Sequence, residues 1–258
     1  MNRLIKRTED SKPILAAYIT AGFPNLDSTI PICKAFEANG ADVIEIGFPF
    51  SDPLADGEII QKANLCAIQN GMTLKVLFTQ LKKLRSEVNI PVILMGYFNP
   101  VVQYGISNFF KKLSEVGVDG AIIPDLPIYE FKRDVQSILK ETGLVMPLLI
   151  TPTTKDSRIR EIDSISSGFI YAVSSNSTTG GVLELSESRI TYLKHLRSLE
   201  LKNKIFVGFG ISNRETVQEV QCYCKGAIVA SAIMKAIQAP GDPIENAAKF
   251  VRALASNN

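Results

Sequence analysis

The sequence predicts a parallel α/β barrel, a single-domain (β/α)8 or TIM barrel over residues 1–258, from three observations. Short apolar runs alternate with longer segments of helical spacing along the chain, and the alternation occurs eight times within 258 residues. Eight such units in a chain of this length are typical of the barrel. No Gly/Ser-rich linker or block of like charge divides the chain, so we expect no domain boundary. We also expect an extra N-terminal helix and a short helix after the last strand.

The eight expected strands are nearly continuous apolar runs rather than alternating ones. Parallel strands that are covered on both faces have this pattern. In chain order they are ILAAYIT from Ile14, DVIEIG from Asp42, PVILMG from Pro91, GAIIPD from Gly120, LVMPLLIT from Leu144, FIYAVSS from Phe169, KIFVGFG from Lys204 and GAIVAS from Gly226.

The segments between these runs carry apolar residues at helical spacing. The segment SNFFKKLSEVG places Phe109, Phe110 and Leu113 on one face and ends at Gly117, as helices often do. A second segment, TLKVLFTQLKKLRSEV, repeats leucine or phenylalanine every three or four residues from 74 to 84. Both segments are therefore expected to be helices with one buried face.

A doubly wound open sheet is the alternative α/β architecture. Such a sheet usually needs fewer strands than the eight expected here. Its dinucleotide-binding fingerprint is also incomplete, because Gly208 and Gly210 are followed by Asn213 where a third glycine belongs. The barrel is therefore the favoured fold.

Composition and charge exclude several classes of function. The 28 basic and 26 acidic residues leave a net charge of +2, which gives no basic field for nucleic acid or an anionic membrane. The N-terminal segment lacks the apolar core of a secretion signal, and no run approaches the roughly 20 apolar residues of a membrane span. Cys222 and Cys224 are close but point to different faces of a helical pattern, so buried thiols are favoured over a metal or redox pair. We expect a cytoplasmic protein.

Glu45 is the sharpest candidate for chemistry, because active sites of TIM barrels lie at the carboxyl ends of the strands. It interrupts an apolar strand between Ile44 and Ile46. An isolated buried carboxylate is costly and its pKa rises, which suits a group that gives and takes protons. The alternative is a structural glutamate paired with a lysine or arginine, and strand position alone does not decide between the two.

Two aspartates follow Glu45 in the longest loop after a strand, which we call loop 2. Asp52 precedes a proline and Asp56 precedes a glycine, and both dipeptides are routine in turns. Each aspartate alone therefore favours a structural role. Their position above the strand that holds Glu45 also allows carboxylates to divide acid/base work from electrostatic stabilisation.

Two later loops are candidates for ligand contacts. The Ser-, Thr- and Gly-rich segment 174–186 suits either a mobile lid or an ordinary connection. Gly208 and Gly210 follow the seventh strand, and Ser231 opens a helix after the eighth, where barrels often bind phosphate. The single histidine, His195, lies on a basic amphipathic helix, so a triad or a multi-histidine metal site is not expected.

At its second strand the sequence resembles a known family. The segment EIGFPFSDPLADGEIIQ, residues 45–61, is similar to the signature of the tryptophan synthase alpha chain. The resemblance covers essentially the whole chain. Its further motifs are ITAGFP at Ile19, MGYFNP at Met95, GVDGAIIPDLP at Gly117, STTGG at Ser177 and VGFGIS at Val207.

The resemblance implies a reaction and the residues that carry it. The family cleaves indole-3-glycerol phosphate into indole and glyceraldehyde 3-phosphate, a retro-aldol lyase step of tryptophan biosynthesis that needs no cofactor. Glu45 would be the general acid/base, and Asp56 would accept a hydrogen bond from the indole N–H. The other implied contacts are Tyr18 at the indole, Tyr171 as a positioning residue, Thr179 closing onto Asp56, and Gly180, Gly210 and Ser231 at the phosphate.

The resemblance also implies a partner. Family members form an α2β2 assembly with a beta chain that uses pyridoxal phosphate to join indole to serine. Asp52, Pro53 and Asn99 would lie at this interface. This chain itself would need no cofactor or metal.

Three departures from the family pattern and two alternatives remain. The segment SSNSTTG from Ser174 stands where many members have an arginine and small residues before the threonine. Glu58 stands where a proline is usual and Ala230 where a glycine is common, and these affect loop 2 and phosphate affinity rather than a catalytic atom. One alternative is another phosphosugar barrel enzyme, which would need a lysine that no expected strand end offers. The other is a non-catalytic subunit that only activates a beta chain.

Overall fold

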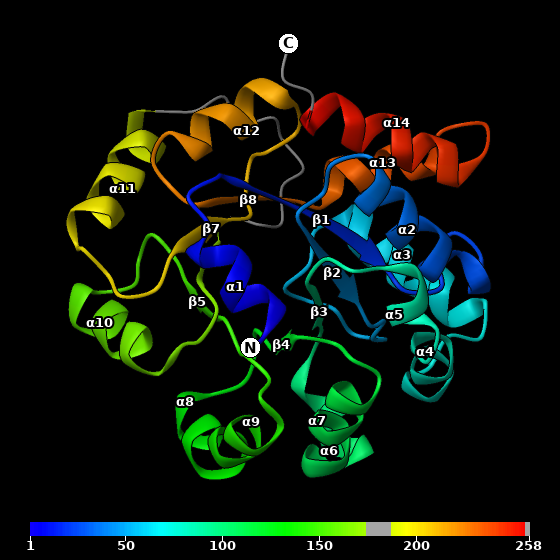
Figure 1. The fold of residues 1–258 in the computed structure, drawn as a ribbon, viewed down its shortest axis with the longest axis horizontal. Helices are drawn as coiled ribbons and strands as arrows, with labels where there is room; N and C mark the ends of the chain where they lie inside the picture. The colour runs from blue at the N-terminus through cyan, green and yellow to red at the C-terminus, as the bar shows by residue number, and fades with distance from the viewer. Residues whose placement is uncertain (174–186, 256–258) are drawn as a thin grey trace.

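The computed structural model describes residues 1–173 and 187–255, and these form the expected barrel. Eight parallel strands run in the order β4-β3-β2-β1-β8-β7-β6-β5, with helices around them (Figure 1). The strands are β1 (Ile14–Thr20), β2 (Val43–Gly47), β3 (Val92–Met95), β4 (Gly120–Ile122), β5 (Leu148–Ile150), β6 (Ile170–Ala172), β7 (Ile205–Val207) and β8 (Gly226–Val229).

Helical segments occupy every connection between strands. They include the expected extra helix before β1 and the short helix after β8. The segments are α1 (Arg3–Glu9), the 3-10 helix η1 (Leu26–Ser28), α2 (Thr29–Ala38), α3 (Glu58–Gln69), α4 (Leu74–Leu81), α5 (Leu84–Glu87), α6 (Phe98–Tyr104), α7 (Ile106–Glu115), α8 (Ile128–Glu130), the π-helix η2 (Phe131–Val135), α9 (Gln136–Thr142), α10 (Asp156–Ile165), α11 (Glu187–Ser198), α12 (Arg214–Gln221), α13 (Ser231–Gln238) and α14 (Pro243–Ala255). No helix among the described residues is long and apolar enough to cross a membrane.

The fourth and fifth strands meet at the weakest part of the barrel wall, which we call the seam. Gly120 and Val145 form an isolated parallel bridge, in which the Ala121 N–H donates to the Val145 carbonyl at 3.0 Å. Pro147 lies two residues further on and has no N–H to donate to the next rung. The expected strand from Leu144 is therefore shortened to β5, which begins after this proline.

The segment from 74 to 84, expected as one helix, forms the two helices α4 and α5. The chain turns at Lys82 and Lys83. Leu84 is nevertheless fully buried, as are Leu77 and Leu81. The periodicity therefore identified the buried face although it did not locate the end of the helix.

Strand residues alternate between the barrel lumen and the layer under the helices. In β2, Val43 belongs to the lumen cluster, whereas Ile44 and Ile46 pack toward the helices. Successive side chains of a strand point to opposite faces, so Glu45 points into the lumen with Val43. In the sheet, Glu45 lies beside Tyr18 of β1.

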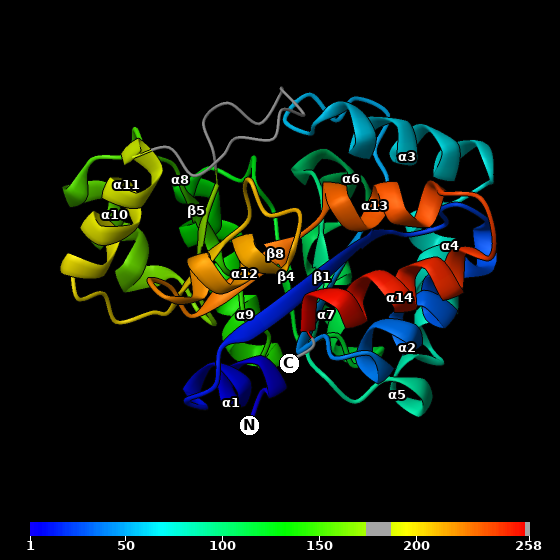
Figure 2. The same cartoon turned by 90° about the horizontal axis from the view of Figure 1, so that it is seen from above.

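Helix α1 closes the amino end of the barrel (Figure 2). Its Leu4 side chain is fully buried in the lumen cluster. The Asn2 side chain caps the helix by accepting from the Leu4 N–H at 2.9 Å, and its amide donates to the Asp119 carbonyl at 2.7 Å. Helix α1, which we call the plug, is thus joined by a hydrogen bond to Asp119, the residue before β4.

Asp119 joins this plug to the barrel wall. Its carboxylate is 3% exposed and accepts from Arg85 Nη2 at 2.6 Å, the Val92 N–H at 2.9 Å and Arg3 Nη1 at 3.2 Å. Its carbonyl accepts the Val145 N–H at 3.1 Å, which is half of the closing bridge. One buried residue therefore holds α1, β3 and the seam together.

We expect Asp119→Ala to lower the free energy of unfolding by about 3–5 kcal/mol, because it leaves the largely buried Arg85 guanidinium without its carboxylate. Arg3→Ala is the matched control, since Arg3 is 47% exposed and its loss should cost about 1 kcal/mol or less. Urea denaturation followed by circular dichroism measures both variants. Equal losses in the two variants would contradict the assignment of Asp119 as the joint.

Candidate active site

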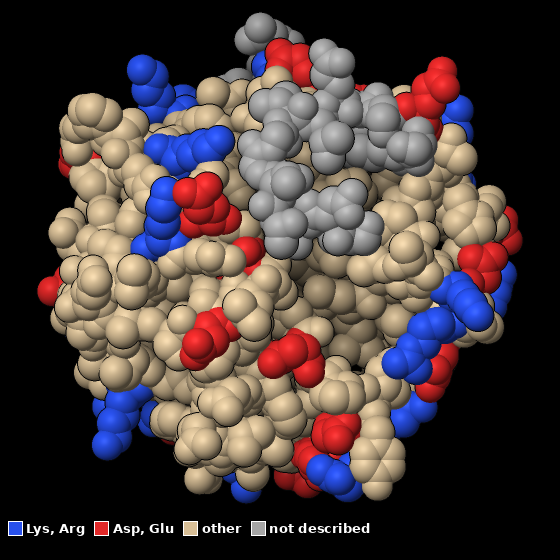
Figure 3. Space-filling view, turned by 180° about the vertical axis from the view of Figure 1, so that it is seen from behind, with Lys and Arg blue, Asp and Glu red and all other residues tan. Residues whose placement is uncertain are grey.

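The carboxyl ends of the strands open on the face opposite α1, which Figure 3 shows in space-filling form. A hollow lies near the centre of this face. Several acidic side chains lie beside it, whereas most lysines and arginines in the view lie toward the edge. Basic side chains are therefore not concentrated at this part of the face.

Glu45 lies in the lumen beneath this hollow and is the only buried carboxylate besides Asp119 among the described residues. Its side chain is 0% exposed, and neither carboxyl oxygen has a hydrogen-bond partner among those residues. Burial raises the pKa of Glu45 to about 8. The structural alternative, a glutamate paired with lysine or arginine, is therefore not supported by the described residues.

Two tyrosines line the lumen with Glu45. Tyr18 precedes Thr20 on β1 and its hydroxyl lies 3.3 Å from the Thr20 hydroxyl. Burial raises the pKa of Tyr18 and of Tyr171, and the carboxylate charges of Glu45 and Asp56 raise both further. The four predicted residues from β1, β2, loop 2 and β6 thus share one electrostatic environment.

Two glycines give these tyrosines room. A Cβ on Gly47 would overlap the Tyr18 ring and hydroxyl, and a Cβ on Gly208 would overlap those of Tyr171. The glycines end β2 and follow β7, so each lies on a strand next to the one that holds the tyrosine. Each glycine therefore leaves the space that the neighbouring tyrosine side chain occupies.

Asp56 lies at the mouth of the lumen and is only partly buried. Burial raises its pKa to about 6, and hydrogen bonds from Tyr97 and Asn64 oppose that rise. Asn64 Nδ2 donates to Asp56 Oδ2 at 3.4 Å. Its smaller burial and these donors, which favour the charged carboxylate, keep the pKa of Asp56 below that of Glu45.

Tyr97 fixes loop 2 as well as the aspartate. Its hydroxyl accepts the Ala55 N–H at 3.0 Å, which leaves its proton for Asp56. Its ring packs on Phe50 with the centroids 5.1 Å apart. Asp56 is thus held by Tyr97, which precedes α6, and by Asn64 of α3.

The sequence did not assign roles to Tyr97 and Asn64. Tyr97 lies in the motif MGYFNP, which was used only for the resemblance. Asn64 is 4% exposed and shares the buried face of α3 with Ile60, Ala63 and Ala67. A polar residue on the apolar face of an amphipathic helix is the signal that could have identified it.

Two of the predicted phosphate contacts follow β7 and β8, which lie on the opposite side of β1 from β2 and Glu45. Gly210 follows β7 with a φ of 62°, a left-handed conformation that favours glycine. Ser231 is exposed and is the first residue of α13, whose first N–H groups have no acceptor within the helix. Thr179 and Gly180 lie outside the described residues.

Three residues predicted at a partner interface lie on the rim. Asp52 and Asn99 are exposed and Pro53 is partly buried. Asp52 accepts a hydrogen bond from the adjacent Ser51 hydroxyl. It takes no part in the cluster around Glu45, in agreement with the expectation that it belongs to the turn.

The departures at Glu58 and Ala230 have local explanations, and the segment SSNSTTG lies outside the described residues. Glu58 is the first residue of α3, where a carboxylate is favourable, and it pairs with Lys62 at 2.6 Å one turn later. Proline is equally suited to that first position. Ala230 precedes α13 with a φ of −113°, which any residue adopts, so glycine is not required there.

The remaining candidates lie away from the lumen. His195 Nε2 lies 2.9 Å from Asp156 Oδ1, which joins α11 to α10 on the outside of the barrel. Cys222 is exposed and Cys224 is buried. Within the described part of the chain, no three His, Cys, Asp or Glu side chains are grouped to hold a metal ion.

The arrangement sets two carboxyl groups in opposite charge states near neutral pH. Glu45, with a pKa of about 8, holds a proton that it can transfer. Asp56, with a pKa of about 6, is mostly ionised and can stabilise positive charge. A substrate between them could be protonated at one point while the charge that develops is stabilised at another.

Comparison with known proteins identifies the family of the chain. The family model for the tryptophan synthase alpha chain matches residues 4–258. The curated tryptophan synthase alpha chain of Flavobacterium johnsoniae is 49% identical over 241 residues, which are 93% of this chain and 95% of that one.

Solved structures give the same result. The tryptophan synthase alpha chain of Legionella pneumophila subsp. pneumophila has a TM-score of 0.88 at 32% identity and covers 99% of this chain and 96% of its own. A chain of a tryptophan synthase complex from Pyrococcus furiosus has a TM-score of 0.85 at 35% identity and covers 94% and 98%. With its fold and near-complete coverage on both sides, this chain belongs to the tryptophan synthase alpha chain family.

Proposed function

We propose that Glu45 and Asp56 carry out the lyase reaction of the family in this chain. The tryptophan synthase alpha chain cleaves indole-3-glycerol phosphate into indole and glyceraldehyde 3-phosphate, and the chain needs no cofactor for this step. The observation that supports the residue roles best is the fully buried Glu45 carboxyl, which has no partner among the described residues and acts on the same two tyrosines as the mostly ionised Asp56. In this proposal residues 1–258 act as one domain in the cytoplasm.

The reaction needs one proton donor that later becomes an acceptor. Protonated Glu45 gives its proton to C3 of the indole, which places a positive charge on the ring nitrogen. Asp56 accepts a hydrogen bond from that N–H and stabilises the charge. Glu45 then removes the proton of the side-chain hydroxyl next to C3. The carbon–carbon bond breaks, its electrons return to the ring, and the aldehyde leaves.

The remaining site residues position the substrate in this proposal. Tyr18 and Tyr171 line the indole pocket, and their raised pKa values keep both hydroxyls neutral. Gly210 and Ser231 bind the phosphate with α13, whose N-terminal N–H groups favour an anion. Thr179 and Gly180, outside the described residues, are assigned the contact to Asp56 and a phosphate contact on resemblance alone.

We expect Glu45→Gln to lower the rate of indole release by at least about 100-fold, because general acid–base catalysis contributes about 10²–10⁴-fold. Asp56→Asn should lower kcat/KM by a comparable factor, since it removes the negative charge that faces the indole nitrogen. Glu58→Gln is the matched control in the same loop and should retain the wild-type rate within about twofold. Indole release from indole-3-glycerol phosphate measures all three.

Near wild-type cleavage by Glu45→Gln and Asp56→Asn would show that the residue roles are wrong. If wild-type protein cleaves nothing even with a beta chain present, the chain acts only as an activator of that partner. The assay is therefore run with and without a beta chain.

The two pKa values also predict a bell-shaped dependence of kcat/KM on pH. Activity should rise through about pH 6 as Asp56 ionises, and fall above about pH 8 as Glu45 loses the proton it must donate. Asp56→Asn should remove the acidic limb and keep the basic one. A profile whose acidic limb is unchanged in this variant would assign that limb to another group.

The proposal includes a tryptophan synthase beta chain as partner, in an α2β2 assembly whose beta chain holds pyridoxal phosphate. The Pyrococcus furiosus relative belongs to a tryptophan synthase complex, which supports a partner. Asp52, Pro53 and Asn99 are assigned to the interface. Exposed apolar side chains follow three neighbouring strands on this face: Leu54 is 83% exposed, Val102 47% and Tyr129 68%.

We expect Leu54→Asp to weaken association with a beta chain by at least tenfold, because a charge would replace an apolar side chain that the interface should bury. Leu65→Asp is the matched control, since Leu65 is 58% exposed on α3. Titration calorimetry with a purified beta chain measures both. Equal affinities of the two variants would place the interface elsewhere.

A further inference from the structure

A cavity of about 240 Å³ lies in the barrel wall at the seam between β4 and β5. It begins above the bridge between Gly120 and Val145, where Pro147 ends the ladder. The two strands diverge beyond that point, and side chains rather than hydrogen bonds fill the space between them. The cavity therefore follows from the position of Pro147 in the sequence.

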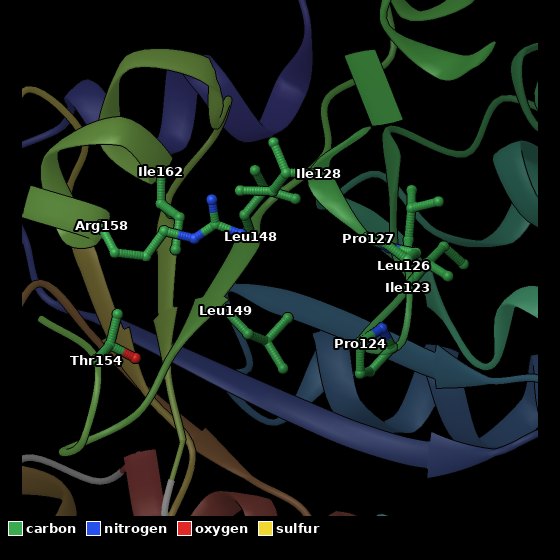
Figure 4. A pocket seen from close by; sticks show the side chains of 10 residues that line it. All are labelled: Ile123, Pro124, Leu126, Pro127, Ile128, Leu148, Leu149, Thr154, Arg158 and Ile162. Atoms are coloured by element: carbon green, nitrogen blue, oxygen red, sulfur yellow. The ribbon is translucent and has the colours of Figure 1, made fainter. Parts of the chain in front are cut away.

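Most of the residues that line the cavity have apolar side chains (Figure 4), and polar atoms also form part of its exposed wall. Side chains of β5 form one wall and those of the segment after β4 form the facing wall. The segment after β4 leads through α8 into the π-helix η2, and π-helical turns are frequent at functional sites. The lining residues are Ile123, Pro124, Leu126, Pro127, Ile128, Leu148, Leu149, Thr154, Arg158 and Ile162.

The inner wall of the cavity is shared with the active-site lumen. Leu149 packs against the lumen cluster and pairs in register with Tyr171 of β6. Leu148, the next residue, packs toward the helices. The cavity therefore extends from the lumen wall to the helical layer.

The two polar side chains at the cavity, Arg158 and Thr154, already have partners. Arg158 Nη1 donates to Glu161 Oε2 at 2.6 Å, and Lys132 Nζ donates to the other oxygen of Glu161 at 2.9 Å. The Thr154 hydroxyl accepts the Thr151 N–H at 2.9 Å. An anionic ligand would meet the carboxylate beside Arg158, so the cavity favours a neutral molecule.

The size and shape of the cavity limit the range of possible ligands further. A cavity of about 150 Å³ lined by aliphatic and aromatic side chains is large enough to bind benzene, so 240 Å³ suits a small bicyclic ring. The Arg158 side chain extends toward Leu148 and Ile128 (Figure 4). From there its guanidinium can stack on an aromatic face while it keeps its bond to Glu161.

We propose that the seam cavity is a second binding site for indole, the neutral aromatic product of the cleavage reaction. The choice of indole rests on the proposed function, whereas the cavity and its preference for a small neutral aromatic molecule do not. Indole that leaves the lumen meets this site at Leu149. The site holds product outside the catalytic pocket.

Equilibrium dialysis with indole tests the proposal, and the chain is well suited because it contains no tryptophan. The fluorescence of added indole can therefore be read without a protein tryptophan signal. Wild-type protein should bind two equivalents of indole. Ile128→Phe fills the cavity from its partly exposed rim and should bind one, with the cleavage rate within about twofold of wild type.

Two further variants complete the test. Leu65→Phe, the matched control on α3, should keep both equivalents. Arg158→Met changes a side chain that is 48% exposed, so folding should tolerate it. It should weaken the second equivalent by about threefold, as loss of an exposed cation–π contact of roughly 0.5–1 kcal/mol would do. Crystals soaked in 5-bromoindole should show bromine between Leu148 and Ile128.

One equivalent of indole in the wild type, or two in Ile128→Phe, would overturn the proposal. So would bromine found only in the lumen. Cleavage of indole-3-glycerol phosphate is measured on the same samples. Normal cleavage with a single indole equivalent removes only the seam site, whereas loss of cleavage in the wild type removes the proposed function.

Discussion

The buried carboxylate of Asp119 is the interaction on which the rest of the barrel depends. It accepts hydrogen bonds from Arg85, Arg3 and the Val92 N–H, and its own carbonyl takes part in the closing bridge. All of these contacts lie at the amino ends of the strands, where α1 covers the lumen (Figure 2). Because these contacts close the barrel at its amino end, residues at the carboxyl ends of the strands need not contribute to its stability.

Glu45 shows what that freedom permits. A buried carboxyl without a partner lowers stability, since the chain must either keep it protonated or pay to desolvate its charge. The barrel tolerates this because Ile44 and Ile46, on either side of Glu45, are both fully buried under the helices. The strand is held by its other face and by its ladders to β1 and β3. In the same way, the seam can lack sheet hydrogen bonds at Pro147 because contacts at the amino end keep the barrel closed.

Much of the fold could be predicted from the sequence, because parallel strands buried on both faces leave continuous apolar runs, and all eight expected strands are present. Glu45 was visible because a charge interrupts such a run. The contacts of Tyr97 and Asn64 with Asp56 could not be predicted, since they join loop 2 to residues that precede α6 and lie in α3. The shortened β5 follows from Pro147, whose missing N–H matters only once the partner strand is known.

Glu45 and Asp56 differ in protonation state near neutral pH because their surroundings differ. Both lose solvation at the lumen, and burial raises the pKa of each. Asp56 receives hydrogen bonds from Tyr97 and Asn64, which favour its charged form, whereas Glu45 receives none among the described residues. The pKa of Asp56 therefore stays lower because this carboxyl is less buried than Glu45 and accepts from two neutral donors. A cation there would have ionised the glutamate and removed the proton that the indole needs.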